Sequence, residues 1–156
     1  MGIKSFQGVR QVQKEGVKEA ILVSDYMTTS LITFSPTQSI LEVMECFAKY
    51  PISGGPVLND KKELVGIVSE ADCMKQISES RYFNLPILDK SVASFMSKEV
   101  ETIDTSASIF DAATIFHSNS RRRLPVLKDG KLVGQISRKD IVIAALKLSS
   151  QQWKKQ

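Results

Sequence analysis

The chain has 156 residues, of which 42% are hydrophobic and 24% are charged, an ordinary composition for a soluble globular protein. Its length fits one compact domain or two very small units, and two half-length units would bury so little surface alone that we expect them to pack together. The formal net charge of +4 and the pI near 9.1 are only mildly basic, and no apolar run approaches the length that a membrane helix needs.

Residues 1–21 form an N-terminal extension. Ile3, Phe6 and Val9 are separated by polar residues without a clean period, so the extension fits either a mobile arm or a segment that packs on a second subunit. It lacks the apolar core of a signal peptide. Cys46 and Cys73 show no disulfide pattern and are expected to be buried structural thiols, which together with the missing signal predicts a cytoplasmic protein.

The rest of the chain contains an internal repeat. An offset of 69 residues aligns the first part of the two copies, and an offset of 68 aligns the remainder after one residue is lost in a polar turn. The matched pairs include Val23 and Val92, Met27 and Met96, Pro56–Leu58 and Pro125–Leu127, and Leu64–Gly66 and Leu132–Gly134. Chance similarity would not keep this order over so long a stretch, and a turn is where a true repeat tolerates a deletion.

The first copy, residues 22–79, predicts the order β-α-β-β-α. An extended piece over Leu31–Phe34 precedes a helix that begins after Ser39, whose side chain and that of Glu42 resemble a capping box. Two apolar runs joined by polar residues then predict a β-hairpin, and a second helix follows. The expected ranges are 56–58 and 64–69 for the strands, 59–63 for the turn and 70 to about 78 for the helix.

Residues 80–90 are expected to be a connector, in which Tyr82 and Phe83 indicate a packed loop. The second copy, residues 91–148, predicts the same order, with residues 149–156 as a C-terminal tail. Ser108 is the expected N-cap, although Asp111 matches a capping box less well than a glutamate would. The other expected elements are an extended piece over 100–103, a hairpin with its turn at 128–131, and a helix from 138 to about 148.

Both hairpins end in the phrase Gly-x-x-Ser-x-x-Asp, which contains Ser69 and Asp72 in one copy and Ser137 and Asp140 in the other. A serine at a strand-to-helix junction can cap the helix, and a carboxylate in the first turn suits the helix dipole. The same geometry also suits a ligand. A carboxylate there can accept hydrogen bonds from both hydroxyls of a ribose, while backbone N–H groups and the hydroxyl can meet a phosphate. The residues alone leave both interpretations open.

These features in this order resemble the cystathionine-β-synthase-type domain, called the CBS domain, and two in tandem resemble a Bateman module. The resemblance covers residues 22–148 and rests on the Ile32-Thr33 strand, the Ser39 helix, the Gly55-Pro56-Val57 strand start and the Gly-x-x-Ser-x-x-Asp ending, occurring twice. It implies an α/β (α+β) fold in which two sheets face each other across a pseudo-two-fold axis, leaving two clefts that often hold AMP, ADP, ATP or another adenosyl compound.

The resemblance also implies site residues and an assembly. The ribose-binding acids would be Asp72 and Asp140 with their serine neighbours, and base-contacting strands and loops would line the same clefts. The complete expected set is Thr33, Phe34, Ser53, Gly54, Gly55, Pro56, Ser69, Asp72, Thr102, Ile103, Arg122, Arg123, Leu124, Pro125, Ser137, Arg138 and Asp140. Such modules often pair, so a homodimer is expected, and any regulated protein would be a separate, unidentified polypeptide.

The two copies differ in charge. The second carries Arg121–Arg123, Arg138 and Lys139, whereas the first has Glu70 and Ala71 at the positions of the last two. Because an arginine offers a planar fork to phosphate oxygens, we expect non-equivalent sites with a phosphate preference near the second copy. The alternative is that Arg121–Arg123 are solvated loop charges.

The sequence predicts no enzyme. His117 is the only histidine, expected at the surface or at a helix end, and it has no cysteine or second histidine nearby for a metal site. No phosphate loop or dinucleotide fingerprint is present, and the serines have no histidine partner. Two other functions stay open: nucleic-acid binding, which the lack of a basic stripe with interleaved aromatics disfavours, and a dimerisation or docking module without ligand.

Overall fold

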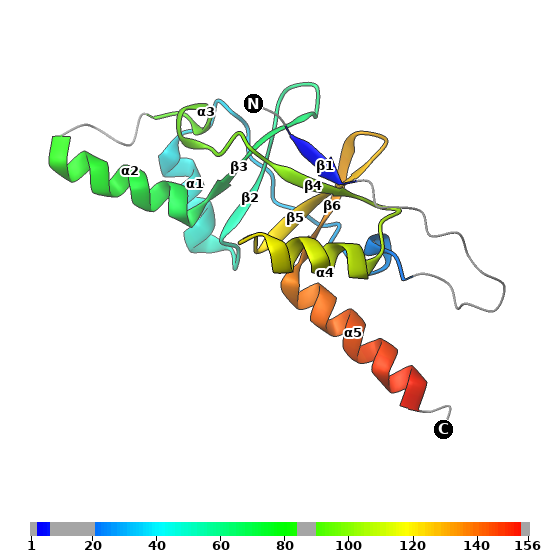
Figure 1. Cartoon of the computed structure of the whole chain (residues 1–156). Coiled ribbons are helices and arrows are strands. Elements are labelled where there is room, and N and C mark those ends of the chain that lie inside the picture. The colour runs from blue at the N-terminus through cyan, green and yellow to red at the C-terminus, as the bar shows by residue number, and fades with distance from the viewer. Residues whose placement is uncertain (1–2, 7–20, 84–89, 154–156) are drawn as a thin grey trace. The chain divides into compact units, whose positions relative to one another are not determined.

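The computed structural model describes residues 3–6, 21–83 and 90–153 (Figure 1). Helices and strands make an α+β fold, in which the second copy shows the expected β-α-β-β-α order and the first copy shows it from its first helix onward. The described residues divide into two compact units. The first contains Leu31–Val100 and Ile3, and the second contains Lys4–Ser30 together with the chain from Glu101 onward.

The first unit is built on an antiparallel hairpin of β2 (Gly54–Leu58) and β3 (Leu64–Ser69). The expected strand over Leu31–Phe34 is reduced to one parallel bridge, in which Phe34 pairs with Val57. Helices α1 (Ile40–Lys49), α2 (Glu70–Phe83) and α3 (Val92–Phe95) complete the unit. Its core holds the buried side chains Phe34, Ile40, Val43, Val57, Val68, Cys73, Val92 and Phe95.

The second unit has a four-stranded sheet in the order β1-β4-β5-β6. Its elements are β1 (Lys4–Phe6), a 3-10 turn (Val23–Asp25), β4 (Glu101–Asp104), α4 (Ile109–Ser118), β5 (Arg123–Lys128), β6 (Lys131–Ser137) and α5 (Arg138–Trp153). Strand β4 begins and ends one residue later than expected. It is a full strand because β1 pairs with it in parallel on one side and β5 on the other, whereas the extended piece of the first unit has only its bridge to β2.

Each unit contains the opening segment of the other copy: residues 91–100 belong to the first unit, and residues 22–30 belong to the second. In the first unit, Val92 N–H donates to the Gln38 carbonyl at 2.8 Å, and in the second, Val23 N–H donates to the Ala107 carbonyl at 2.8 Å. Both valines are fully buried. The spatial units are therefore crossed relative to the copies in the sequence.

Gly66 and Gly134 make this exchange sterically feasible. A Cβ on Gly66 would lie 2.6 Å from Met96 Sδ, and one on Gly134 would lie 2.7 Å from Met27 Sδ. At the same places Ile67 and Ser97 form an antiparallel bridge, as do Gln135 and Thr28. The methionine and the glycine that recur in each copy thus contact each other across copies, within one unit.

Both first helices begin at the expected serine, but the capping differs from expectation. Ser39 Oγ accepts from Glu42 N–H at 3.2 Å. Ser108 Oγ accepts from Asp111 N–H at 3.1 Å, and Ser108 N–H also donates to Asp111 Oδ2 at 3.0 Å, which completes a capping box. The shorter aspartate therefore closes the box that we expected to be the weaker one.

The second helices are longer than expected. Helix α2 continues to Phe83, so the backbone of Tyr82 and Phe83 is helical rather than a packed loop, and α5 continues through the expected tail to Trp153. The expectation stopped at serines, which are poor helix formers. Here Ser80 Oγ bonds to the Ile77 carbonyl at 2.8 Å and Ser150 Oγ to the Lys147 carbonyl at 2.9 Å, so the hydroxyls are satisfied within the helix.

The two hairpin turns have different designs. The first, with its five polar residues, is closed by Asn59, whose Oδ1 accepts from the N–H groups of Lys61 at 3.0 Å and Glu63 at 2.9 Å. The second has two central residues, Asp129 with φ 52° and Gly130 with φ 77°. Two positive φ angles are what a tight hairpin turn of the primed type requires, and aspartate and glycine adopt them readily.

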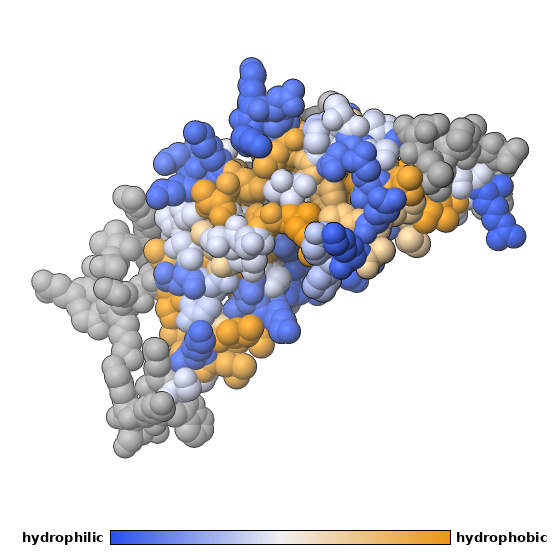
Figure 2. All heavy atoms as spheres, turned by 180° about the vertical axis from the view of Figure 1, so that it is seen from behind, coloured by the Kyte–Doolittle hydropathy of each residue, from blue (hydrophilic) through white to orange (hydrophobic). Residues whose placement is uncertain are grey.

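Apolar and hydrophilic side chains are interspersed on the face seen in Figure 2. Cys73 is buried as expected and Cys46 is partly buried, and both are free thiols. Within the described ranges, no helix combines the length and the apolar character needed to cross a membrane.

Candidate functional site

The strand-to-helix junction of the first unit is organised by Ser69 and Asp72. Asp72 Oδ2 accepts two hydrogen bonds from Ser69, one from its N–H at 2.8 Å and one from its hydroxyl at 3.0 Å. Asp72 N–H in turn points to Ser69 Oγ at 3.4 Å. The pair caps α2, and both residues remain partly exposed.

The second unit repeats this arrangement. Asp140 Oδ2 accepts from Ser137 N–H at 2.8 Å and from its hydroxyl at 2.9 Å, and Asp140 N–H points to Ser137 Oγ at 3.3 Å. The Gly-x-x-Ser-x-x-Asp sequence therefore forms the same local structure twice. Corresponding hydrogen-bond distances in the two units differ by no more than 0.1 Å.

This geometry assigns different parts to the two side chains. The serine proton is directed at the carboxylate, so the hydroxyl orients the aspartate instead of donating to a ligand. The carboxylate uses Oδ2 for the cap, and Oδ1 takes no part in these bonds. A partly exposed carboxylate oxygen held in one rotamer is a suitable acceptor for the adjacent hydroxyls of a ribose. The capping and ligand-binding interpretations are therefore compatible.

The other expected residues of the first unit converge on this junction. Gly54 pairs with Ser69 in the hairpin, and the Ser53 carbonyl accepts from Glu70 N–H at 2.9 Å. Phe34 N–H donates to the Pro56 carbonyl at 2.9 Å. A Cβ on Gly55 would lie 2.8 Å from the Ile32 carbonyl oxygen, so only glycine lets the extended segment approach β2 this closely.

Side-chain access in the first unit is uneven. Thr33 is exposed, whereas Phe34 packs in the core and Gly54, Gly55 and Pro56 are buried. In the extended segment, Thr33 is therefore the exposed side chain, whereas the N–H and carbonyl of Phe34 are both bonded to β2.

The expected residues of the second unit also converge, but Thr102 is buried where its counterpart Thr33 is exposed. Arg123 pairs with Ser137, and Ile103 pairs with Val126 in the neighbouring strand. Ile103 and Leu124 lie in the hydrophobic core, Pro125 is buried, and Thr102 has no exposed surface. Thr102 lies opposite Ser5 in the β1–β4 ladder, an edge that has no counterpart beside Thr33.

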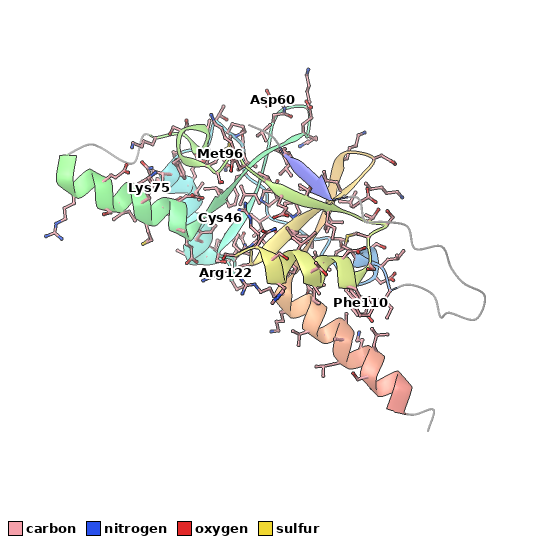
Figure 3. The ribbon with its side chains drawn as sticks, in the orientation of Figure 1. Cys46, Asp60, Lys75, Met96, Phe110 and Arg122 are labelled. Carbon is pink, nitrogen blue, oxygen red and sulfur yellow. The ribbon has the colours of Figure 1, made fainter. Side chains whose placement is uncertain are left out.

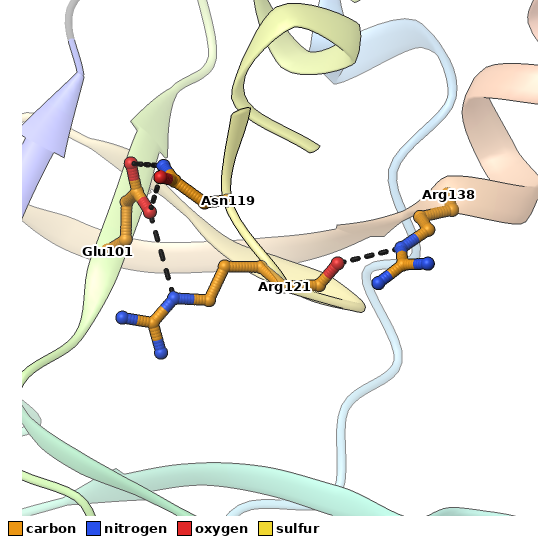
Figure 4. A network of polar contacts seen from close by, with 4 residues as sticks. All are labelled: Glu101, Asn119, Arg121 and Arg138. Carbon is orange, nitrogen blue, oxygen red and sulfur yellow. Dashed lines mark hydrogen bonds and ion pairs between the residues drawn. The ribbon is translucent and has the colours of Figure 1, made fainter. Parts of the chain in front are cut away.

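The arginines of the second unit do not all lie free in solvent. Arg121 Nε lies 3.7 Å from Glu101 Oε2, and Asn119 Nδ2 lies 3.0 Å from both oxygens of the same carboxylate (Figure 4). Arg138 Nε donates to the Arg121 main-chain carbonyl at 2.7 Å. Arg122 is exposed at the approach to β5 (Figure 3).

Glu101 and Asn119 were not identified from the sequence. Neither belongs to a short motif, and their partner Arg121 was counted only as one member of a basic run. The signal that could have found them is the comparison of copies, because Glu101 and Asn119 stand where the first copy has Ile32 and Tyr50.

Two titratable groups have perturbed pKa values: Cys73, which follows the Ser69–Asp72 junction, and Asp104, at the end of β4. Burial raises the pKa of the Cys73 thiol, and the neighbouring carboxylates of Asp72 and Glu70 raise it further. The pKa of Asp104 is lowered by the Ser106 hydroxyl, 2.7 Å from its Oδ1, and by the Ser106 N–H. The first change makes Cys73 an unreactive neutral thiol at physiological pH.

Nothing in the described ranges groups three metal-binding side chains of the histidine, cysteine or carboxylate kind. His117 is exposed in the last turn of α4, as expected.

Known proteins share this architecture. The CBS domain family model matches residues 23–79 and 92–147. The structure of Arabidopsis thaliana CBSX2 in complex with AMP is 31% identical, covers 83% of this chain and 98% of that chain, and superposes with a TM-score of 0.73. Protein MJ1426 of Methanocaldococcus jannaschii is 29% identical over 82% of this chain and 93% of its own length.

Inosine-5'-monophosphate dehydrogenase of Aquifex aeolicus is 31% identical over 83% of this chain, but the match spans only 26% of that enzyme. The family model covers both copies of the repeat. The CBSX2 structures match this chain over 98% or more of their own length. The chain belongs to the CBS-domain family and carries two CBS domains in tandem.

Proposed function

We propose that the chain is a non-catalytic regulatory module that binds an adenine nucleotide at the Ser-Asp junction of each unit. The observation that carries this proposal is the pair of matched carboxylates, Asp72 and Asp140, each held by two hydrogen bonds to Oδ2. The AMP complex of CBSX2, 31% identical to this chain, supports the ligand class.

In the proposed complex, Asp72 or Asp140 accepts hydrogen bonds from the two ribose hydroxyls. The exposed Thr33 and the main chain beside it contact the base in the first unit, with Ser53 and Gly54–Pro56 around it. In the second unit Thr102, Ile103 and Arg122–Pro125 take the equivalent positions beside Ser137 and Arg138. AMP, ADP and ATP are the proposed ligands, acting as regulators rather than as cofactors of a reaction.

The test is calorimetry and thermal unfolding of the wild type and of Asp72→Asn, Asp140→Asn and the double variant, with AMP, ADP, ATP and S-adenosylmethionine. A charged hydrogen-bonding partner contributes roughly 1.5–3 kcal/mol, so each single change should weaken its own site about tenfold or more. At 100 times Kd, bound nucleotide should stabilise the fold by about 2.7 kcal/mol.

Asp60→Asn is the matched control because Asp60 lies exposed at the tip of the β2–β3 hairpin, at the other end of these strands from the Ser69–Asp72 junction (Figure 3). It removes the same charge and should leave binding unchanged. Absence of any shift with millimolar adenine ligands in the wild type would reject the proposal, and unchanged binding in the double variant would reject the site assignment.

We further propose that the module acts as a homodimer on a separate protein in the cytoplasm. Native mass spectrometry of freshly purified protein would show a dimer mass with any retained nucleotide, whereas a monomer at micromolar concentration would contradict the dimer. Nucleic-acid binding receives little support, because the Arg121 side chain is paired with Glu101 within the second unit.

A further inference from the structure

Arg138 occupies a position that differs between the units while the backbone around it does not. The turn before the hairpin is the same in both: Arg121 N–H donates to the Asn119 carbonyl at 2.7 Å, and Ile52 N–H donates to the Tyr50 carbonyl at 2.8 Å. The first residue of the following helix also donates to this turn in both, Glu70 to Ser53 at 2.9 Å and Arg138 to Arg122 at 3.4 Å. At that residue the side chain changes from a carboxylate to a guanidinium.

Within the described part of the chain, the guanidinium of Arg138 is hydrogen-bonded through its Nε side only. Its Nε donates to the Arg121 carbonyl at 2.7 Å, which leaves both terminal nitrogens outside this bond. Those two nitrogens form the other edge of the fork, the one that binds phosphate oxygens in a bidentate manner. Arg138 is the first residue of α5, directly after Ser137, so its main chain belongs to the same strand-to-helix junction as the Ser137–Asp140 pair, and its side chain extends from there to the turn at Arg121.

The residue that holds Arg138 is itself anchored. Arg121 bonds through its side chain to Glu101, and Asn119 bonds to both oxygens of Glu101 (Figure 4). These contacts tie the turn that contains the Arg121 carbonyl to strand β4. The first unit has apolar or aromatic residues at the three supporting positions, namely Ile32, Tyr50 and Ile52.

We infer that Arg138 is the phosphate-selecting residue of the second unit, positioned by Arg121, Glu101 and Asn119, and that the first unit binds its adenosyl ligand without this contact. The inference rests on the proposed function and adds that the two sites recognise different parts of the ligand. The second unit discriminates adenine ligands by their phosphates. The first unit, with Glu70 in place of Arg138, recognises the nucleoside part and gains little from added phosphate.

Calorimetry on single-site proteins tests this inference. Asp72→Asn weakens the first site, so that this variant reports mainly on the second and is called the second-site protein. Asp140→Asn gives the first-site protein in the same way, and each is titrated with adenosine, AMP, ADP and ATP. In the second-site protein, affinity should rise from adenosine to the phosphorylated ligands by about tenfold or more, which is the scale of charge-assisted hydrogen bonds. In the first-site protein the four affinities should differ by less than about threefold.

Substitutions at Arg138 separate geometry from charge. Adding Arg138→Ala to the second-site protein should remove the preference for phosphate and leave adenosine binding unchanged. Arg138→Lys keeps the charge but has no second edge, so most of the preference should still be lost. Glu101→Gln should reduce the preference a few-fold without changing adenosine affinity, a split that a merely structural defect would not produce.

The reciprocal change is Glu70→Arg in the first-site protein, where the Ile52 carbonyl stands at the position of the Arg121 carbonyl. It should create a phosphate preference. Circular dichroism and thermal unfolding report whether each variant folds, and Lys139→Ala is the control for general loss of positive charge at this junction. Equal affinity of the second-site protein for adenosine and ATP, with no effect of Arg138→Ala, would overturn the inference and leave the proposed function intact. Failure of every adenine ligand to bind would remove both.

Discussion

The two units share a backbone plan and differ in what they place on it. Both keep the glycine under a methionine, the serine that caps the first helix and the Ser-Asp junction. The second unit adds the strand β1 beside β4 and a polar network around Glu101 where the first has apolar residues. The two copies therefore agree at positions whose backbone or capping geometry requires a particular residue, and they differ around Glu101, where the side chains reach the surface.

The exchanged segments give the largest expected effect on stability. Phe95 is 7% exposed in the core of the first unit, whereas its counterpart Tyr26 only packs against the core of the second. Phe95→Ala should lower the free energy of unfolding by about 3–5 kcal/mol, as deletion of a buried aromatic does. Tyr26→Ala should cost clearly less. Urea denaturation of both variants measures the difference, and equal losses would show that the two segments are buried to the same degree.

Replacing either glycine that contacts a methionine should destabilise the fold by a similar amount. Gly66→Ala and Gly134→Ala each insert a Cβ against a sulfur atom and a carbonyl oxygen, at 2.6 and 2.9 Å in one case and 2.7 and 2.9 Å in the other. We expect each to cost about 1–3 kcal/mol, as overpacking does. Gly130→Asn is the control, because no atom lies within 4 Å and asparagine tolerates its positive φ. A loss confined to one of the first two variants would contradict the equivalence of the exchanged segments.

Removing the helix caps should change the free energy of unfolding by a smaller amount, and the change should differ between the units. Ser39→Ala and Ser108→Ala should each cost about 1 kcal/mol, with the larger loss at Ser108 because its bond partner Asp111 completes a box. Thermal unfolding monitored by circular dichroism measures both. Thr114→Ala, on the exposed face of α4, controls for the general effect of alanine on this helix. Larger destabilisation by Ser39→Ala would reverse the ranking.

The smallest expected effect is a pH dependence of stability that arises from Asp104 in the second unit and has no counterpart at the matching position of the first. Asp104 has its pKa lowered by Ser106, and the first copy has the non-titrating Ser35 at this position. Because the folded pKa lies below the unfolded one, the contribution is complete above about pH 4 and is lost as the pH falls through the folded pKa. Asp104 is partly exposed and its carboxylate is screened by solvent, so the loss should be a small fraction of the total stability. Ser106→Ala should flatten this part of the stability profile below about pH 4, whereas Thr37→Ala should not; an unchanged profile in Ser106→Ala would contradict the assignment.

The sequence predicted the features that depend on local chemistry. The hairpins, the Ser39 and Ser108 caps and the helices that follow Ser69 and Ser137 arise from nearby residues, and the repeat showed each of them twice. It did not reveal that Val23 and Val92 join the opposite units, because an offset between copies identifies matching positions and not the core that each position enters. It also missed the pairing of β1 with β4 and the Glu101 network, which depend on contacts between distant parts of the chain.

The crossed segments have a consequence for how such a module can be divided or built. A fragment that ends in the connector after the first copy keeps Val23, which belongs to the second core, and lacks Val92 and Phe95, which belong to its own. A chain with a single copy could complete its core only by borrowing the missing segment from another molecule or by folding its own leading segment back. Joining two copies in one chain makes that borrowing intramolecular and independent of protein concentration. The tandem pair, rather than the single repeat, is then the smallest piece that can be inherited or transplanted as a folding unit.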